Sequence, residues 1–130
     1  HTKGNKNCHI ILRGGKDGPN YRLPDIIKTL SILDTKGIRS NIMVDCSHGN
    51  SGKDYRKQKE VLKYLCDNVM IKSNKNPVIK GIMIESNINE GKQKLVFGEK
   101  DKLKYGVSIT DSCISMDETA SLLFELYDRL

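Results

Sequence analysis

Aromatic side chains are scarce in this sequence: they make up 5% of its residues, and tryptophan is absent. The lysines do not form a block with interleaved aromatic residues, so the stacking surfaces that single-stranded nucleic acids need are not indicated. No stretch approaches the ~18 apolar residues of a membrane-spanning helix. The first residues, HTKGNKN, lack the apolar centre of a signal peptide. We therefore expect a cytoplasmic protein with no nucleic-acid and no membrane partner.

Cysteine pairs with the spacing of a structural zinc site are also absent. The four cysteines stand at positions 8, 46, 66 and 113, and no two of them form a C-x-x-C pair. Without a secretory signal, free thiols in a reducing compartment are the expectation. We expect all four to be buried as small apolar side chains.

Positive charge is in excess, with a net charge of +6 on 130 residues. The lysines are scattered rather than grouped, which is typical of a solvated surface. An anionic small substrate would fit the same charge. Apolar residues make up 37% of the chain, which is enough for the core of one domain of ordinary size.

Three segments are predicted to be buried strands: 8–14 (CHIILRG), 40–48 (SNIMVDCSH) and 78–86 (VIKGIMIES). Each is short, rich in Ile, Val or Met, and polar at its end. Apolar runs without strict alternation are typical of strands covered on both faces, as in parallel sheets. The polar, glycine-punctuated segment 87–106 is predicted to be a long loop or a hairpin.

Three helices are predicted, over 23–37, 51–72 and 116–130. Pro24 suits the first turn of the first helix, and Gly37 suits its end. Ser51 and Asp54 have the spacing of a capping box for the second helix, and the third starts near Ser115. Helical periodicity predicts three apolar faces: Ile26, Ile27, Leu30 and Leu33; Val61, Leu62, Leu65 and Val69; and Leu123, Leu126 and Leu130.

The alternation of strands and helices predicts an α/β fold. The strands recur at roughly 30 to 40 residues, near the ~30 residues per unit of a (β/α)8 TIM barrel. A complete barrel needs about 250 residues, so only about three of its eight strands would be present. We therefore predict that residues 1–130 are the C-terminal portion of a single barrel domain whose N-terminal part is absent. The lack of an initiator methionine favours a fragment, a processed chain or a trimmed sequence.

Reactive side chains stand where the predicted strands end. Barrel enzymes place their chemistry at the C-terminal ends of strands, and here those ends carry Arg13, His48 and Glu85. Asp111 follows the long loop and could return over the same mouth. One imidazole and two carboxylates suit a divalent metal such as Mn, Fe, Co or Zn. The plainer interpretations are a satisfied polar histidine and an ion-paired glutamate.

The glycines after Arg13 and the cysteine before His48 each allow more than one interpretation. Arg13 precedes Gly14 and Gly15, and arginine with accessible backbone amides could clamp a phosphate, although a glycine pair after a strand is usually only a turn. Cys46 lies two residues before His48 and would point to the same side of a continuing strand. The residues alone do not decide between Cys46 and another cysteine as a soft metal ligand.

Four stretches, HIILRGGKDGPNY, IMVDCSHGNSGKD, GIMIESNINEG and YGVSITDSCI, resemble the class I 3-deoxy-D-arabino-heptulosonate 7-phosphate (DAHP) synthases. The resemblance runs from His9 to the final helix. It implies a metal-dependent transferase with a TIM barrel that opens the shikimate pathway of aromatic amino acid biosynthesis. The implied reaction joins phosphoenolpyruvate to erythrose 4-phosphate and releases phosphate, and the implied assembly is a homo-oligomer.

The resemblance also implies roles for single residues. His48, Glu85 and Asp111 match the family's metal ligands, which makes His48 and Asp111 catalytic candidates. Arg13 matches an arginine that holds the phosphate of phosphoenolpyruvate.

Three further residues of the same motifs, Gly14, Asp45 and Ser47, are expected to help bind substrate. The family's fourth metal ligand is a cysteine on the first barrel strand, which is absent here, so Cys46 is not expected to replace it.

Two other classes of function stay open at this point. One is a barrel fragment that acts as a non-catalytic interaction module, and full metal ligation would argue against it. The other is a related phosphoenolpyruvate-dependent synthase that uses another aldose phosphate, although ESNINEG favours the heptulosonate enzyme. With two open sheet edges, the 130 residues alone are expected to be inactive and to need the missing part of the barrel or a second copy as a partner.

Overall fold

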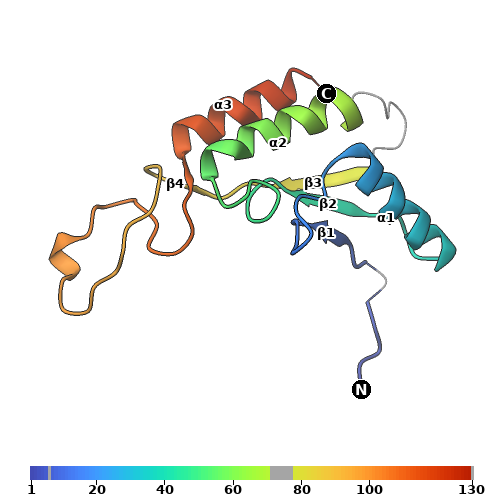
Figure 1. Cartoon of the computed structure of the whole chain (residues 1–130), viewed down its shortest axis with the longest axis horizontal. Helices are drawn as coiled ribbons and strands as arrows, with labels where there is room; N and C mark the ends of the chain where they lie inside the picture. The colour runs from blue at the N-terminus through green and yellow to red at the C-terminus, as the bar shows by residue number, and fades with distance from the viewer. Residues whose placement is uncertain (6, 71–77, 130) are drawn as a thin grey trace.

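The computed structural model describes residues 1–5, 7–70 and 78–129. Its centre is a parallel sheet in the order β1-β2-β3, formed by Ile10–Leu12, Ile42–Asp45 and Ile79–Met83. Three helices, α1 (Leu23–Thr35), α2 (Gln58–Leu65) and α3 (Met116–Tyr127), lie on one side of this sheet (Figure 1). The α/β class with parallel strands is therefore confirmed for the described residues.

All three predicted strands form, but each is shorter than predicted. The polar residues at their ends belong to the following turns. Arg13, His48 and Glu85 therefore lie just beyond the last residues of β1, β2 and β3 rather than inside them. Because the strands are parallel, the three turns share one edge of the sheet.

Burial differs between the strands, contrary to the expectation of cover on both faces. Ile42 and Val44 of the central strand β2 are fully buried. Ile10 and Ile11 of β1 are 39% and 42% exposed. Helices pack against one face only (Figure 1), so an edge strand keeps much of its apolar surface in contact with solvent.

Helix α1 begins at the predicted residue and ends at Thr35, two residues before the predicted bound. Pro24 lies in its first turn, and Gly37 follows its end with a left-handed φ of +63°. Its buried face consists of Ile26 and Leu33, with Leu30 packed against the core. Ile27 was predicted on this face but is 56% exposed. Successive side chains on a helix point in different directions, so residues 26 and 27 cannot both face the core.

Helix α2 begins later than predicted. The Ser51 hydroxyl donates to the carbonyl of His48 instead of capping a helix. Asp54 accepts a bond from the Arg56 amide at the start of a 3-10 turn, η1 (Tyr55–Lys57), and α2 follows it. The predicted capping box is wrong because residues 49–53 form the turn that carries His48. The apolar face is confirmed, since all four of its residues are buried: Val61, Leu62, Leu65 and Val69.

The end of the second predicted helix is partly described. A π-helical turn, η2 (Cys66–Met70), continues α2, and positions 71 and 72 lie outside the described residues. None of the helices in the described ranges has the length and apolar character that crossing a membrane requires.

Helix α3 is capped as predicted, with the Ser115 hydroxyl accepting the Glu118 amide at 3.1 Å. Of its predicted apolar face, Leu126 is confirmed and Leu123 is wrong. Leu122 is buried and Leu126 packs against the core, whereas Leu123 is 50% exposed. Leu130, the third predicted member of this face, lies outside the described residues.

The segment after β3 is the predicted long loop but not a hairpin. Two short strands, β4 (Ser86–Asn87) and β5 (Ile114–Ser115), flank it and pair in parallel. Between them the loop holds one 3-10 turn, η3 (Lys100–Lys102), and projects from the body of the domain (Figure 1). Gly91 and Cys113 exchange backbone hydrogen bonds of 2.8 and 3.1 Å, so the loop returns beside its own start. This return brings Asp111 back to the strand ends.

The four cysteines are free thiols. Three of them, Cys46, Cys66 and Cys113, are buried as expected, and burial raises the pKa of each thiol. Cys8 is exposed, contrary to expectation, because it precedes β1 outside the core.

The one-residue correction in α3 predicts a stability difference between adjacent leucines. Leu122→Ala removes a buried side chain and should lower the free energy of unfolding by about 2–5 kcal/mol. Leu123→Ala, at a half-exposed neighbour with the same chemistry, should cost less than about 1 kcal/mol. Urea unfolding of both variants measures the two values. Equal losses would mean that α3 is rotated from the orientation described here.

Candidate functional site

Three side chains that can bind a metal converge at the strand ends. The Nε2 atom of His48 lies 3.4 Å from Oε1 of Glu85 and 3.8 Å from Oδ2 of Asp111. One potential ligand atom from each of the three falls within 4.8 Å of the others. That spacing is compatible with one ion at ~2.0–2.3 Å from each donor. His48 and Glu85 are about a quarter exposed and Asp111 is two-thirds exposed, so the group is open on one side.

The buried carboxylate of Asp45 orients the imidazole of His48. Its Oδ2 lies 2.7 Å from His48 Nδ1, and its Oδ1 accepts the amide of Ser47 at 2.8 Å. A carboxylate at Nδ1 favours the tautomer with its proton on that nitrogen, which leaves the lone pair of Nε2 facing Glu85 and Asp111. The Asp45 side chain is only 2% exposed, so it lies beneath the site and not on its surface.

Glu85 is held through both its side chain and its backbone. The Ser47 hydroxyl donates to Glu85 Oε2 at 2.6 Å. The fully buried amide of Gln58, at the start of α2, donates to the Glu85 carbonyl and accepts the Glu85 amide, at 3.0 and 2.8 Å. This pair of bonds fixes Glu85 after β3 has ended, together with the bond that the Ile114 amide of β5 donates to the Glu85 carbonyl at 3.1 Å.

Asn50 ties the turn after β2 to the end of β1. Its buried side-chain amide donates to the carbonyls of Leu12 and Asp45, at 2.9 and 2.8 Å. Its carbonyl oxygen accepts the backbone amide of Asn20 at 2.8 Å. One side chain thus fixes the relative positions of the segments that carry Arg13 and His48.

Gly14 permits these two segments to touch. Its φ is +75°, and a Cβ there would lie 2.5 Å from the carbonyl carbon of Gly49, which no side chain could tolerate. The Gly14 amide donates to the side chain of Asn20 at 2.7 Å, so this donor is already used within the chain.

A cavity of about 300 Å³ opens above the cluster. Five of the predicted site residues line it: Arg13, Ser47, His48, Glu85 and Asp111. The Arg13 side chain is 58% exposed, and its Nε lies 3.9 Å from Asp45 Oδ2. Asp45 and Gly14, also predicted, do not line the cavity, and of the two only Asp45 is buried.

The sequence interpretation missed other residues of the site. Lys53, Lys92 and Ser112 also line the cavity, and Asn50 and Gln58 support it. Lys53 stands within the quoted motif IMVDCSHGNSGKD, but nothing in a polar loop distinguishes Lys92 from its neighbouring lysines. Gln58 is hidden in the polar run RKQKE, whose composition gives no sign of a buried residue.

Cys46 does not share the orientation of His48. Strand β2 ends at Asp45, so two-residue alternation does not extend to the histidine, which stands in a turn with φ +48°. Cys46 is fully buried, and burial with the adjacent negative charge of Asp45 raises its pKa to about 12. Its thiol therefore stays protonated at neutral pH. Within the described ranges, the only group of three possible metal ligands is His48, Glu85 and Asp111.

Comparison with known proteins gives consistent results. The model of the DAHP synthetase I family matches residues 1–124. The tyrosine-inhibited phospho-2-dehydro-3-deoxyheptonate aldolase of Schizosaccharomyces pombe is 46% identical over 99% of this chain. The Tyr-sensitive enzyme of that name from Escherichia coli is also 46% identical over 99% of it.

A solved structure extends the similarity to the fold. The phospho-2-dehydro-3-deoxyheptonate aldolase of Francisella tularensis superposes with a TM-score of 0.87, at 41% identity and over 98% of this chain. The chain spans about a third of the length of these relatives, 34% and 35% of the two enzymes and 36% of the solved chain. Because the family model matches nearly all of the sequence, the chain belongs to the DAHP synthetase I family.

Proposed function

We propose that this chain is the C-terminal third of a DAHP synthase barrel. The whole protein would condense phosphoenolpyruvate with erythrose 4-phosphate to give 3-deoxy-D-arabino-heptulosonate 7-phosphate and phosphate. The observation that carries this proposal is the convergence of His48, Glu85 and Asp111 within 4.8 Å beside parallel strand ends. The remaining strands would come from the N-terminal part of the barrel, and we expect the complete protein to be a homo-oligomer.

His48, Glu85 and Asp111 would hold a divalent ion of Mn, Fe, Co or Zn. One nitrogen and two carboxylate oxygens form a donor set that these ions accept. Such an ion supplies Lewis-acid polarisation of an aldehyde oxygen when it is bound. Asp45 keeps the Nε2 lone pair of His48 available, and Ser47 directs one oxygen of Glu85 away from the cluster, leaving Oε1 for coordination.

The cavity would receive the reacting ends of both substrates. A new bond would join the methylene carbon of phosphoenolpyruvate to the aldehyde carbon of erythrose 4-phosphate, and water addition would precede the loss of phosphate. Arg13, exposed at the cavity wall, would bind the phosphate of phosphoenolpyruvate. Ser47 lines the same cavity, whereas we assign Asp45 and Gly14 to positioning because neither of them lines it.

A fusion tests the proposed function. This chain would replace the corresponding third of the E. coli Tyr-sensitive relative, with which it is 46% identical. The purified fusion should form the heptulosonate product from both substrates with added Mn²⁺, and His48→Ala in the same fusion should abolish product formation. A folded fusion that binds metal and makes no product would contradict the proposal.

Removing the carboxylate under His48 should weaken metal binding without removing a ligand. Asp45→Asn loses the acceptor that fixes the Nδ1 proton, and such a change typically costs 10- to 100-fold in metal affinity. Titration of the metal-free protein with Mn²⁺ or Co²⁺ measures the dissociation constant directly. Asp17→Asn, at an exposed carboxylate outside the cavity, is the matched control and should bind as tightly as the wild type. An unchanged affinity in Asp45→Asn would remove Asp45 from this role.

Arg13→Lys should impair use of phosphoenolpyruvate. A lysine keeps the charge but cannot form the two parallel bonds of a guanidinium, so the loss should be about 1–3 kcal/mol in kcat/KM for that substrate. Steady-state kinetics in the fusion, with each substrate varied in turn, measures this loss. If kcat and the KM for phosphoenolpyruvate both stay at the wild-type values, Arg13 does not belong to the site.

A further inference from the structure

Gln58 is a polar side chain in a core position of helix α2. It stands three residues before Val61 and seven before Leu65, on the buried face of this helix, and it is fully buried itself. An apolar residue would fill such a position without any need for hydrogen bonds. A buried amide is tolerated only where its donor and its acceptor find partners, so the partners of Gln58 indicate what it does.

Both partners of the Gln58 amide belong to one residue, Glu85. The Gln58 Oε1 atom accepts the Glu85 backbone amide at 2.8 Å, and its Nε2 atom donates to the Glu85 carbonyl at 3.0 Å. The two residues are 27 positions apart in the chain. One side chain therefore binds the backbone of a proposed metal ligand on both sides of its Cα atom, which restricts rotation of that backbone.

This contact replaces a strand neighbour that Glu85 lacks on the β2 side. The Cys46 amide donates to the Met83 carbonyl at 2.9 Å, which extends the β2–β3 ladder by one residue. In a continued parallel ladder the Cys46 carbonyl would next accept the Glu85 amide. The chain turns away instead to place His48, and the Glu85 amide donates to Gln58. A primary amide has the donor and the acceptor of a peptide group, so it can take the place of the missing neighbour.

The other contacts of Glu85 reach it from different directions. The Ile114 amide of β5 donates to the same carbonyl at 3.1 Å, and the Ser47 hydroxyl donates to Oε2 at 2.6 Å. In the part of the chain that the structure describes, the Glu85 amide has no acceptor besides Gln58. Loss of Gln58 would therefore free the backbone on the amide side, and the carboxylate could leave its place 3.4 Å from His48 Nε2.

We propose that Gln58 is a positioning residue for the metal site: its side-chain amide replaces the strand neighbour that leaves to carry His48, and so holds the Glu85 carboxylate in a coordinating position. This inference rests on the proposed function, in which Glu85 is a metal ligand. Gln58 does not line the cavity, so it acts through Glu85 and touches neither the metal nor the substrates. The first residue of α2 thereby becomes part of the site.

Gln58→Met and Gln58→Asn test this role in the fusion protein. Gln58→Met keeps the length of the side chain and removes both bonds, whereas Gln58→Asn keeps an amide that is one carbon too short to reach both groups of Glu85. In each variant the dissociation constant for Mn²⁺ or Co²⁺ should rise about 10- to 100-fold, the usual effect of losing a residue that orients a metal ligand. The visible absorption spectrum of bound Co²⁺ should also change, because it reports the coordination geometry.

Hydrogen exchange measures the same contact in the absence of metal. The Glu85 amide should exchange faster in metal-free Gln58→Met than in the metal-free wild type, because the group that accepts its hydrogen bond is gone. An unchanged exchange rate would show that Gln58 does not hold this amide, and the inference would be wrong.

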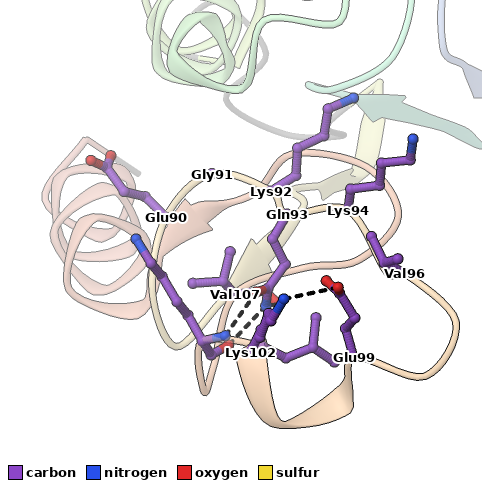
Figure 2. A pocket seen from close by; sticks show the side chains of 11 residues that line it. Glu90, Gly91, Lys92, Gln93, Lys94, Val96, Glu99, Lys102 and Val107 are labelled. Carbon is purple, nitrogen blue, oxygen red and sulfur yellow. Dashed lines mark hydrogen bonds and ion pairs between the residues drawn. The ribbon is translucent and has the colours of Figure 1, made fainter.

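Two variants control for a general loss of stability. Leu122→Ala removes a buried side chain that does not line the candidate cavity, so it should lower stability and leave the metal affinity and the Co²⁺ spectrum unchanged. Gln93→Met removes the same chemical group from the loop cavity of Figure 2, where the Gln93 amide bonds to the backbone of the loop. It should also bind metal like the wild type, because the bonds between Gly91 and Cys113 fasten the Asp111 segment separately.

The outcomes separate this inference from the proposed function. The inference is overturned if Gln58→Met binds Co²⁺ with the affinity and spectrum of the wild type. It is also overturned if Leu122→Ala loses as much affinity, since reduced stability would then explain the loss. If the fusion forms no heptulosonate while Gln58→Met binds metal more weakly than Gln93→Met, the proposed function fails and the role of Gln58 stands.

Discussion

The hydrogen bond between the buried carboxylate of Asp45 and Nδ1 of His48 is the interaction on which the candidate site depends. Asp45 is the last residue of the central strand, and its carboxylate points into a turn that leaves it almost no contact with water. A carboxylate buried in this way needs partners, and it finds them in the His48 ring and the Ser47 amide. The same bond determines which imidazole nitrogen faces Glu85 and Asp111.

Side-chain amides help to fix the turns beyond the strands, in addition to backbone bonds such as that from the Ile114 amide to the Glu85 carbonyl. Asn50 bonds to the carbonyls at the ends of β1 and β2, and Gln58 bonds to both backbone groups of Glu85. Both side chains are buried and satisfied, so their bonds hold these turns rigid. Gly14 adds a close backbone contact with Gly49 that a side chain at position 14 would prevent. Rigid turns of this kind suit a site that must keep ligand atoms a few ångströms apart.

The sequence patterns predicted elements well and boundaries less well. The three strands, the three helices and the caps at Pro24, Gly37 and Ser115 follow from local preferences that the fold respects. The start of α2 was misplaced because Ser51 bonds back to the turn that carries His48, a contact that competes with capping. Leu123 was predicted to be buried in place of Leu122 because both belong to one apolar run. Only the packing of α3 against the rest of the domain decides which of the two leucines is buried.

The amino-acid sequence was enough to identify the chemical groups of the site and to predict that they stand at strand ends. His48, Glu85, Asp111 and Arg13 were identifiable because parallel strands bring their C-terminal ends to one edge, and because four motifs resemble one family. Three outcomes required the folded chain: Asp45 and Gly14 do not line the cavity, Cys46 is buried away from it, and Lys53 and Lys92 are part of its lining. Those outcomes depend on where β2 ends and on how the long loop returns. Both are set by hydrogen bonds between residues far apart in the chain, which no local pattern records.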